Sequence, residues 1–421
     1  MNVNTWNIRR YVPSCITMVL VAAVFLGIPS AWAAEDKTEY DFSNFENLPL
    51  QKGLPDPFLM PDGKRVKTFQ DWRKERKYIK AMLAHYLYGH MPPRPKKIEI
   101  RQVSSEPCYN GKGVEERYTL TFRRKGKSVT CRFLIVRPSI KKCYPIIIKN
   151  DRLSFGASDF SQSFDPGAEA VKRGYLLCRF HRTDLASDVQ KEGRTAGVYP
   201  LYPEYDWGAL AVWALGHGVV LDALDQLGMA DMSKVVATGH SRGGKAALCA
   251  GIYDDRIVIT APNSSGTGGT GSLRYFEEGQ KPQTIGHHIG RNEHWFGPRY
   301  FQFAEKEDRL PFDAHFAKVV IAPRAFVNCH ARQDYWANPY GTELTHRAAQ
   351  VVFEWLDAGD RMGLYWRNGK HAQNEEDWAA LLDFADKQFF NKKTNRRFDN
   401  WNYPYAKLPF DWKAPDAAPV K

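Results

Sequence analysis

Short apolar runs alternate along the chain with longer stretches of helical periodicity. The runs have the almost continuous apolar character of strands that are buried on both faces. They occupy residues 144–149, 174–180, 234–238, 257–260 and 319–328, and the helical stretches between them include 207–227 and 244–252. Because strands and helices alternate in this way, the sequence predicts an α/β protein with a mostly parallel central sheet and helices on both of its faces.

The part of the chain that precedes this alternation has a different pattern. Residues 71–87 have the periodicity of a helix, within a stretch that is mixed in character and rich in proline. Two segments of alternating apolar and polar residues follow at 116–122 and 128–136. Gly126 stands at the turn between them, and this arrangement predicts a β-hairpin.

The alternating region shows no internal boundary. No linker rich in proline, glycine or serine divides it, and a last helical stretch covers residues 378–390. We therefore expect one α/β domain over residues 34–421. It would carry an N-terminal extension at about 34–100 and an irregular C-terminal tail at about 391–421, which is rich in aromatic residues and proline.

The first 33 residues have the pattern of a secretory signal peptide. Arg9 and Arg10 supply the positive charge, residues 16–28 are apolar, and Ala31 and Ala33 are the small residues of a cleavage site. The alternative is a membrane anchor, but about 13 apolar residues are too few for a bilayer, which needs about 20. We therefore expect residues 1–33 to be removed, which leaves a secreted or periplasmic protein without stable membrane insertion.

The composition narrows the classes of function. With 43% hydrophobic and 25% charged residues, the chain has the composition of a folded globular protein. Loss of Arg9 and Arg10 takes the formal net charge from +12 to +10. A positive charge of this size attracts polyanions such as acidic polysaccharides, or serves solubility alone, and both interpretations stay open. The sequence holds no nucleic-acid-binding motif, so we expect no nucleic acid partner, and we expect a monomer.

The cysteines give no sign of a metal. Six remain after the signal peptide, without a Cys-x-x-Cys pair and without a Cys/His cluster of zinc-site spacing. Cys178, Cys249 and Cys329 lie in apolar runs, where a buried thiol is expected. We therefore predict no metal site and no cofactor.

The clearest chemical signal is Gly-His-Ser-Arg-Gly at residues 239–243. It directly follows an apolar run and directly precedes a helical stretch, which is the strand–turn–helix context of a nucleophile elbow. In such a turn the hydroxyl of Ser241 is exposed, and the N–H groups and dipole of the following helix favour a developing oxyanion. The context predicts an α/β-hydrolase fold with Ser241 as nucleophile. A glycine-rich turn with an incidental serine is the alternative.

The order of catalytic residues in this fold is Ser, then the acid, then His, and it selects the partners of Ser241. His371 lies in a predicted loop after a strand-like stretch and is the predicted base, whereas His315 and His346 fall in predicted helices. Asp334 follows an apolar run and is the predicted acid, which would orient His371 and stabilise its protonated form. The rival acids are Glu293, Glu375 and Asp377.

With this triad in place, the motifs of the chain resemble those of the glucuronoyl esterases, carbohydrate esterase family fifteen. The matching stretches are Asp-Trp-Gly-Ala-Leu at 206–210, Gly-His-Ser-Arg-Gly-Gly-Lys-Ala-Ala-Leu at 239–248, Ser-Gly-Thr-Gly-Gly at 265–269, His-Trp-Phe at 294–296, Ile-Ala-Pro-Arg at 321–324, Asp-Tyr-Trp-Ala-Asn-Pro at 334–339, and His371 followed by Asp-Trp at 377–378. They run from about residue 200 to about residue 380, and as a set they are highly specific.

The resemblance implies a substrate and a role for individual residues. The family hydrolyses the ester between 4-O-methyl-glucuronic acid of glucuronoxylan and lignin alcohols, so glucuronoxylan and lignin–carbohydrate esters are the expected partners. By resemblance, Ser241 is the nucleophile, His371 the base, Arg242 part of the oxyanion hole and Lys245 a ligand of sugar hydroxyls. Ser241 and Lys245 are four residues apart, which places both on one helix face. The further substrate contacts that the resemblance implies are Trp336 and Glu293.

One motif departs from the family pattern. Many members carry a catalytic glutamate just before Ser-Gly-x-Gly-Gly, where this chain has Asn263 and Ser264 and no carboxylate. Other members, mostly bacterial, have the acid after the following strand, and Asp334 matches that place. The resemblance is therefore to the bacterial type.

Two other functions fit the same pattern. An acetyl or feruloyl xylan esterase would have the same fold, although the positive charges of Arg242 and Lys245 favour a uronate. A non-catalytic carbohydrate-binding relative would also share the fold, but it would have no need of the elbow.

Overall fold

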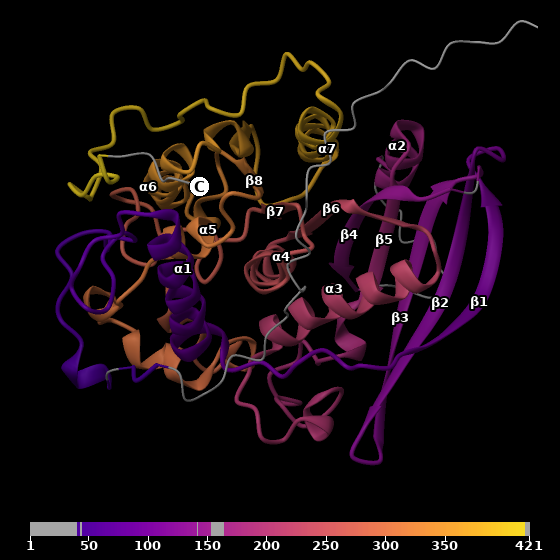
Figure 1. Ribbon diagram of the computed structural model, residues 1–421, viewed down its shortest axis with the longest axis horizontal. Helices are drawn as coiled ribbons and strands as arrows, with labels where there is room; N and C mark the ends of the chain where they lie inside the picture. Colours follow the sequence, from indigo (N-terminus) through magenta and orange to yellow (C-terminus); the bar gives the residue numbers. More distant parts are fainter. Residues whose placement is uncertain (1–39, 43, 141, 153–163, 417–421) are drawn as a thin grey trace, which may run out of the picture. The chain divides into compact units, whose positions relative to one another are not determined.

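The computed structural model describes residues 40–42, 44–140, 142–152 and 164–416. The predicted signal peptide at 1–33 lies outside these residues. The described strands form one nine-stranded sheet in the order β1-β2-β3-β5-β4-β6-β7-β8-β9 (Figure 1). Their bounds are β1 (Glu99–Cys108), β2 (Gly113–Arg124), β3 (Lys127–Pro138), β4 (Tyr144–Asp151), β5 (Leu176–His181), β6 (Ala230–His240), β7 (Ile259–Asn263), β8 (Ala325–Ala331) and β9 (Met362–Arg367).

The sheet has a parallel part and an antiparallel part. Every neighbouring pair from β5 to β9 is parallel, whereas β1, β2 and β3 are antiparallel and β3 joins the rest as an antiparallel neighbour of β5. The turn between β2 and β3 has positive φ at Lys125 (49°) and Gly126 (72°), as a two-residue hairpin requires. The predicted hairpin and the predicted α/β architecture with a mostly parallel sheet are both confirmed.

Helices cover both faces of the sheet, and the side chains of the central strands divide between these faces. In β4, Ile146 and Ile148 join the larger hydrophobic core, whereas Ile147 joins a separate smaller core. The larger core also includes side chains of α1 (Phe69–Leu83), α3 (Ala209–Gln226), α4 (Arg242–Tyr253), α5 (Ala314–Val319) and α6 (Pro339–Trp355), and the smaller core those of α2 (Pro166–Arg173) and α7 (Glu375–Phe390). Strands that are buried on both faces explain the apolar runs of the sequence.

Two helices begin at capping boxes that the sequence specifies. At the start of α1, Thr68 Oγ1 accepts a hydrogen bond from Asp71 N, and Asp71 Oδ2 accepts one from Thr68 N. Asn374 and Asp377 make the same reciprocal pair at the start of α7. Each box satisfies two N–H groups that would otherwise lack a partner within the helix.

One predicted strand is partly wrong. Of the apolar run 319–328, only the part from Ala325 onward is a strand, because Val319 ends α5 and residues 320–323 form a turn. All of residues 319–322 are buried, so a helix end and its turn have the same apolar composition as a buried strand.

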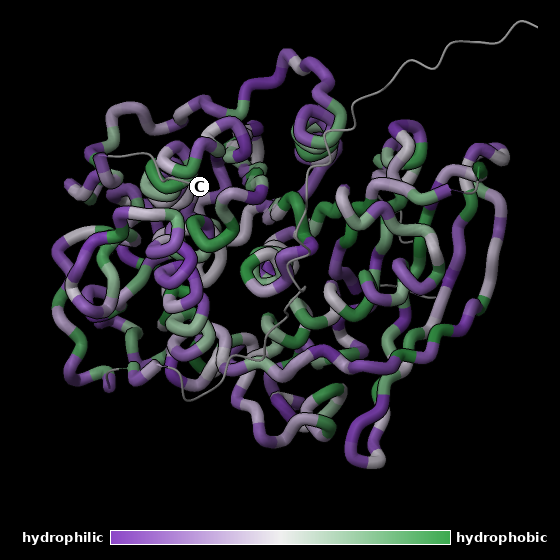
Figure 2. The backbone as a smooth tube through the Cα atoms, in the orientation of Figure 1, coloured by the Kyte–Doolittle hydropathy of each residue, from purple (hydrophilic) through white to green (hydrophobic). Residues whose placement is uncertain are grey.

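Strand β1 was not predicted, because it lacks an apolar face. It is the edge strand next to β2, and most of its side chains are exposed. In Figure 2, hydrophobic colours follow the central strands and α3, whereas the turn between β2 and β3 has hydrophilic colours. Among the helices that the structure describes, none combines the length and the apolar character that crossing a bilayer requires.

Candidate active site

The turn between β6 and α4 holds Ser241 in a strained conformation. Its φ and ψ are 57° and −122°, values that a residue with a side chain rarely adopts. Its N–H donates to Asn263 O at the end of β7 (2.9 Å), which fixes the turn against the neighbouring strand. A Cβ atom on Gly239 would lie 2.3 Å from Gly243 O, so the turn closes only with glycine there. This is the geometry of a nucleophile elbow, and it presents Ser241 at the start of α4.

His371 and Asp334 form a hydrogen-bonded pair at the same edge of the sheet. His371 Nδ1 lies 2.7 Å from Asp334 Oδ2, with the carboxylate side chain 2% exposed and the imidazole 37% exposed. Burial alone would raise the pKa of Asp334, but the hydrogen bond from His371 and the positive potential of nearby histidines hold it below its ordinary value. With Nδ1 donating to Asp334, the neutral imidazole keeps its lone pair on Nε2, the atom that a general base uses.

His240 connects this pair to the elbow. It directly precedes Ser241, and its ring centroid lies 4.4 Å from that of His371. Asn263 Oδ1 is 2.6 Å from His240 Nδ1, so the side chain at the end of β7 holds His240 rather than His371. Burial lowers the pKa of His240 to about 3, so this ring stays neutral when its neighbour takes up a proton.

Arg367 fixes the loop that carries His371. Its Nη2 donates to Lys370 O (3.0 Å) and to Ala372 O (2.6 Å), the carbonyl groups on either side of the histidine. Asp377 Oδ2 accepts from Arg367 Nε at 2.6 Å, and both side chains are buried. Asp377, a rival acid by sequence, therefore orients the arginine and not the imidazole.

Of the other rival acids and histidines, Glu293 and His315 have hydrogen-bond partners elsewhere, and Glu375 and His346 lie in helices. Glu293 Oε1 accepts from Gly290 N at 3.0 Å, which closes its own loop. Glu375 lies exposed in the first turn of α7. His315 is buried with its Nε2 2.8 Å from Pro55 O, and His346 is buried in α6. The pair that the structure brings together is the one predicted from chain order.

Arg242 is held by residues that the sequence analysis missed. Asp188 Oδ2 accepts from Arg242 Nη1 (3.0 Å) and from Arg182 Nη2 (3.0 Å), and Asp188 Oδ1 accepts from the indole N–H of Trp295 (3.0 Å). The Arg242 guanidinium also lies over the Trp295 ring, 4.7 Å from its centroid. Asp188 is only 9% exposed, whereas 42% of the Arg242 side chain remains exposed beside the elbow. No local motif marks Asp188, because its role depends on groups from distant segments.

Lys245 lies one helical turn after Ser241 and is buried, 3% exposed. Its Nζ donates to Ser265 O at 2.5 Å. Burial, together with the positive charge of Arg242, lowers the pKa of Lys245 to about 7. The lysine is therefore a desolvated donor at this site, in equilibrium between its charged and neutral forms near pH 7.

Trp336 follows Asp334 by two residues in the short helix Tyr335–Ala337 and is 45% exposed. Its ring lies edge-on to His287, with the centroids 5.1 Å apart, and its backbone carbonyl accepts from Gln283 N (3.0 Å). The indole thus has a fixed position and an exposed surface in the short helix that directly follows Asp334. Glu293 is half-buried, and no contact of its side chain in the described part of the chain joins it to Trp336.

The arrangement has the parts that acyl transfer requires. It provides a strained serine, an imidazole with a buried carboxylate behind it, and a fixed guanidinium. The N–H groups at the first turn of α4 have no side-chain cap at Ser241 in the described part of the chain. Within the described residues, no group of three or more His, Cys, Asp or Glu side chains could hold a metal ion.

Comparison with known proteins finds relatives over most of the chain. The family model described as "Glucuronyl esterase, fungi" matches residues 120–357. Among curated proteins, Carbohydrate esterase MZ0003 from an unknown prokaryotic organism is 26% identical, over 89% of this chain and 98% of its own length. A 4-O-methyl-glucuronoyl methylesterase of Schizophyllum commune is 29% identical, over 89% of each chain.

Solved structures show the same likeness. A carbohydrate esterase family 15 glucuronoyl esterase from Caldicellulosiruptor kristjansonii superposes with a TM-score of 0.75 and is 30% identical. The match covers 89% of this chain and 100% of that one. The likeness therefore extends over the whole catalytic unit of that protein and is not confined to the elbow.

We predict that Lys245→Met stabilises the protein in a pH-dependent way. Between about pH 7 and pH 10.5 the unfolded chain holds a proton on Lys245 that the folded chain lacks, so the cost of burying the lysine is greatest at low pH and falls as the pH rises. In urea titrations the variant should gain at least about 1 kcal/mol of unfolding free energy at pH 6 and less at pH 9. Exposed Lys127→Met is the control and should change little at either pH. An equal gain for Lys245→Met at both pH values would contradict the assignment of a depressed pKa.

Proposed function

The chain belongs to the glucuronoyl esterase family, whose members are carboxylic ester hydrolases, and from this premise we propose that it cleaves esters of 4-O-methyl-glucuronic acid through an acyl-enzyme on Ser241. The substrate would be the ester between glucuronic acid side chains of glucuronoxylan and lignin alcohols. Curated relatives named 4-O-methyl-glucuronoyl methylesterase support the uronate ester as the reacting group. The observation that carries the proposal is the buried Asp334 carboxylate bonded to His371, at the sheet edge where the elbow presents Ser241.

The reaction proceeds in two steps. His371 Nε2 takes the proton of Ser241 Oγ as the oxygen attacks the ester carbonyl, and Asp334 stabilises the imidazolium that forms. The carbonyl oxygen gains negative charge, which the N–H groups at the start of α4 and the Arg242 guanidinium stabilise. The imidazolium gives its proton to the departing alcohol, which leaves a glucuronoyl ester on Ser241. Water activated by His371 then hydrolyses this ester, releasing the uronic acid and restoring the serine.

Asp188 limits the freedom of Arg242 in this scheme. The carboxylate and the Trp295 ring together hold the guanidinium beside the elbow before substrate arrives. A cation that is already positioned loses little side-chain entropy when negative charge develops. Arg182, which shares Asp188, keeps that carboxylate in place.

Recognition of the sugar would come from Lys245, Trp336 and Glu293. Lys245 Nζ has one acceptor in Ser265 O and further N–H capacity for a sugar hydroxyl. The exposed indole of Trp336 offers an apolar surface to the C–H face of a pyranose ring. Glu293 would accept a hydrogen bond from a glucuronate hydroxyl, which requires its carboxylate to have room for a second donor beside Gly290 N.

We also propose where the protein works. The predicted signal peptide and a polymeric substrate outside the cell support export to the periplasm or the medium, as a monomer with one catalytic domain over residues 34–421. Nothing in the sequence favours a nucleic acid partner.

Substrate choice separates this function from an acetyl or feruloyl xylan esterase. We predict hydrolysis of benzyl glucuronate and little release of acetate from acetylated xylan. Lys245→Met should lower kcat/KM for benzyl glucuronate by at least about tenfold and leave 4-nitrophenyl acetate hydrolysis within about twofold, because the lysine contacts the sugar and not the reacting carbonyl. Equal losses on both esters would mean that Lys245 supports the elbow, and preferred deacetylation of xylan would replace the proposed substrate.

The acid is tested by a pair of amide substitutions. Asp334→Asn keeps the shape of the side chain but favours the wrong imidazole tautomer, which in a well-studied protease triad costs about 10⁴ in turnover. We predict a loss of at least about 10² in kcat for Asp334→Asn, a cautious discount on that figure. Glu293→Gln is the matched control and should keep kcat within about tenfold, with circular dichroism melts to verify folding. Collapse of kcat in the glutamine variant alone would move the acid to Glu293.

A further inference from the structure

A hollow lies at the opposite edge of the sheet from Ser241. Its lining includes Val258, which immediately precedes β7, Ala325, which begins β8, and Arg361, which immediately precedes β9. The strands are parallel, so their first residues mark the edge opposite to the one that carries the elbow. The hollow has a volume of about 750 Å³ and is completed by the end of α7 and the segment that follows it.

The lining of this hollow is strongly basic. Its cations are Arg324, Arg361, Lys387, Lys392, Lys393 and Arg396, and its one carboxylate is Asp360. Three of the cations have carboxylate partners: Arg324 with Asp255 (3.2 Å), Lys392 with Asp386 (3.0 Å) and Arg396 with Asp383 (3.0 Å).

The other three cations, Arg361, Lys387 and Lys393, make no close ion pair with a carboxylate among the described residues, although the pKa of Asp399 is lowered by the hydrogen bond from Arg397 and also by the charge of Lys387. All three are exposed, and Arg361 donates only to a backbone carbonyl, Pro323 O (3.1 Å). Lys387 lies in the last turn of α7, where it complements the helix dipole, and Arg361 ends the three-residue 3-10 helix Gly359–Arg361. Lys393 follows the end of α7.

A neighbouring hollow of about 730 Å³ adds an aromatic surface. It shares Asp360, Lys387 and Arg396 with the first, so the two adjoin, and we call them together the distal cleft. Trp401 lines the second hollow and is 38% exposed. The charges there are balanced, with the carboxylates of Glu354, Asp360 and Asp399 against the cations of Lys387, Arg396 and Arg397.

Trp401 is held in position from one side. The Arg347 guanidinium lies over its ring, 4.8 Å from the centroid. Arg347 Nη2 in turn donates to Glu343 Oε1 (2.6 Å) and to Tyr403 O (3.1 Å), so its position is fixed. The indole is therefore a fixed platform with one side covered by the guanidinium and part of its surface open to the cleft.

We propose that the distal cleft is a non-catalytic binding site for an acidic polysaccharide. A pyranose ring would pack its C–H face on Trp401, and carboxylates carried by the polymer would pair with Arg361, Lys387 and Lys393. An acidic sugar chain could bind both hollows of the distal cleft. Its hydroxyls can form hydrogen bonds with the mixed charges around Trp401, and its widely spaced carboxylates can pair with the cations of the basic hollow. A dense phosphate polymer would meet Glu354, Asp360 and Asp399 as well, at a cost in like-charge repulsion.

The site would act separately from ester hydrolysis. Its place at the far edge of the sheet means that it holds another chain, or a distant part of the same chain, while Ser241 works at the near edge. This inference depends on the proposed function only in the choice of de-esterified glucuronoxylan as the probe. Binding would raise the concentration of enzyme on the polymer and leave the hydrolysis of small soluble esters unchanged.

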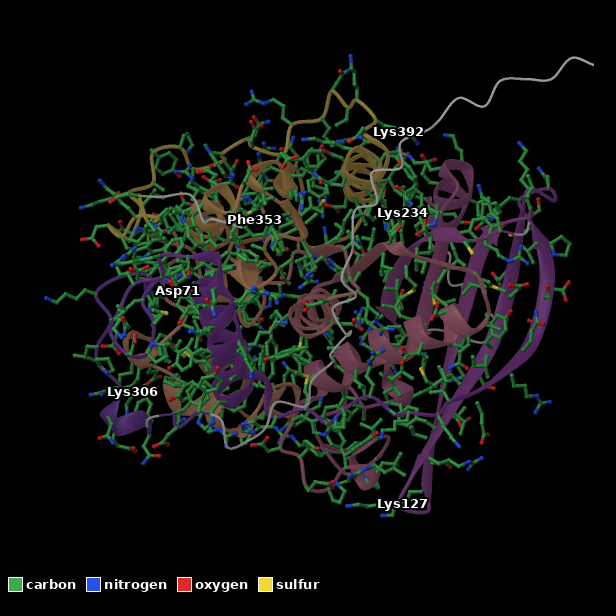
Figure 3. The ribbon with its side chains drawn as sticks, viewed as in Figure 1. Asp71, Lys127, Lys234, Lys306, Phe353 and Lys392 are labelled. Carbon is green, nitrogen blue, oxygen red and sulfur yellow. The ribbon has the colours of Figure 1, made fainter. Side chains whose placement is uncertain are left out.

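The test compares binding by two variants and a matched control. The variants are Trp401→Ala and the double substitution Lys387→Ala/Lys393→Ala. The control is Lys112→Ala/Lys127→Ala, which removes the same charge at two exposed positions, one in the turn between β1 and β2 and one at the β2–β3 hairpin turn. Figure 3 labels Lys127 at the tip of this hairpin and Lys392 beside α7, far apart in the view. Affinity electrophoresis would use de-esterified glucuronoxylan, the same polymer with its carboxyl groups reduced, and inorganic polyphosphate.

We expect both cleft variants to bind glucuronoxylan about tenfold more weakly than the parent and the control, with benzyl glucuronate hydrolysis unchanged. The reduced polymer should bind the parent more weakly than glucuronoxylan, and salt should weaken the glucuronoxylan complex. The proposal would be overturned if the control bound glucuronoxylan as weakly as the cleft variants. It would also be overturned if the parent bound glucuronoxylan and its carboxyl-reduced form equally well. Tighter binding of polyphosphate than of glucuronoxylan would assign the cleft to a phosphate polymer instead. Absence of benzyl glucuronate hydrolysis would contradict the proposed function and leave this binding result intact.

Discussion

Strands β6, β8 and β9 run in the same direction, so their carboxyl ends meet at one edge and bring together residues that are far apart in the chain. Ser241 follows β6, Asp334 follows β8 and His371 follows β9. Each is then fixed locally, Ser241 by a strained turn between glycines and His371 by a loop bonded to Arg367. Reversal of any one strand would send its residue to the far edge, where the distal cleft lies.

The site contains several buried charged side chains, which lower the stability of the fold and also take part in the proposed chemistry. Asp334, Asp377, Asp188 and Lys245 are almost fully removed from water, and each carboxylate has a cationic or imidazole partner. Removing charges from water costs several kcal/mol per ion before pairing compensates it. Lys245 has no carboxylate partner among the described residues, and its Nζ donates to a backbone carbonyl, Ser265 O. Of these four side chains, it is therefore the one whose burial cost is least compensated. The sugar contact that we propose for Lys245 would explain why this cost is retained.

The candidate catalytic residues were predictable because their signals are local or follow chain order. The elbow depends on a five-residue pattern between an apolar run and a helix, and His371 and Asp334 occupy loops that follow predicted strands. Asp188 and Arg367 were not predictable, because their roles arise from hydrogen bonds to distant segments that no spacing encodes. The run 319–328 was predicted as strand throughout because burial gives a helix end and a strand the same composition, and β1 was missed because an exposed edge has no apolar face.

The proposed chemistry requires that His371 activate Ser241 as a nucleophile. The most direct test of this activation is peptide mass mapping after brief exposure of the parent chain and of His371→Ala to a fluorophosphonate, which reacts with activated serine hydroxyls. We predict one adduct in the parent chain, on the peptide that contains Ser241, and a rate of modification at least about 10² lower in His371→Ala. An adduct on another serine, or equal rates in the two chains, would contradict it.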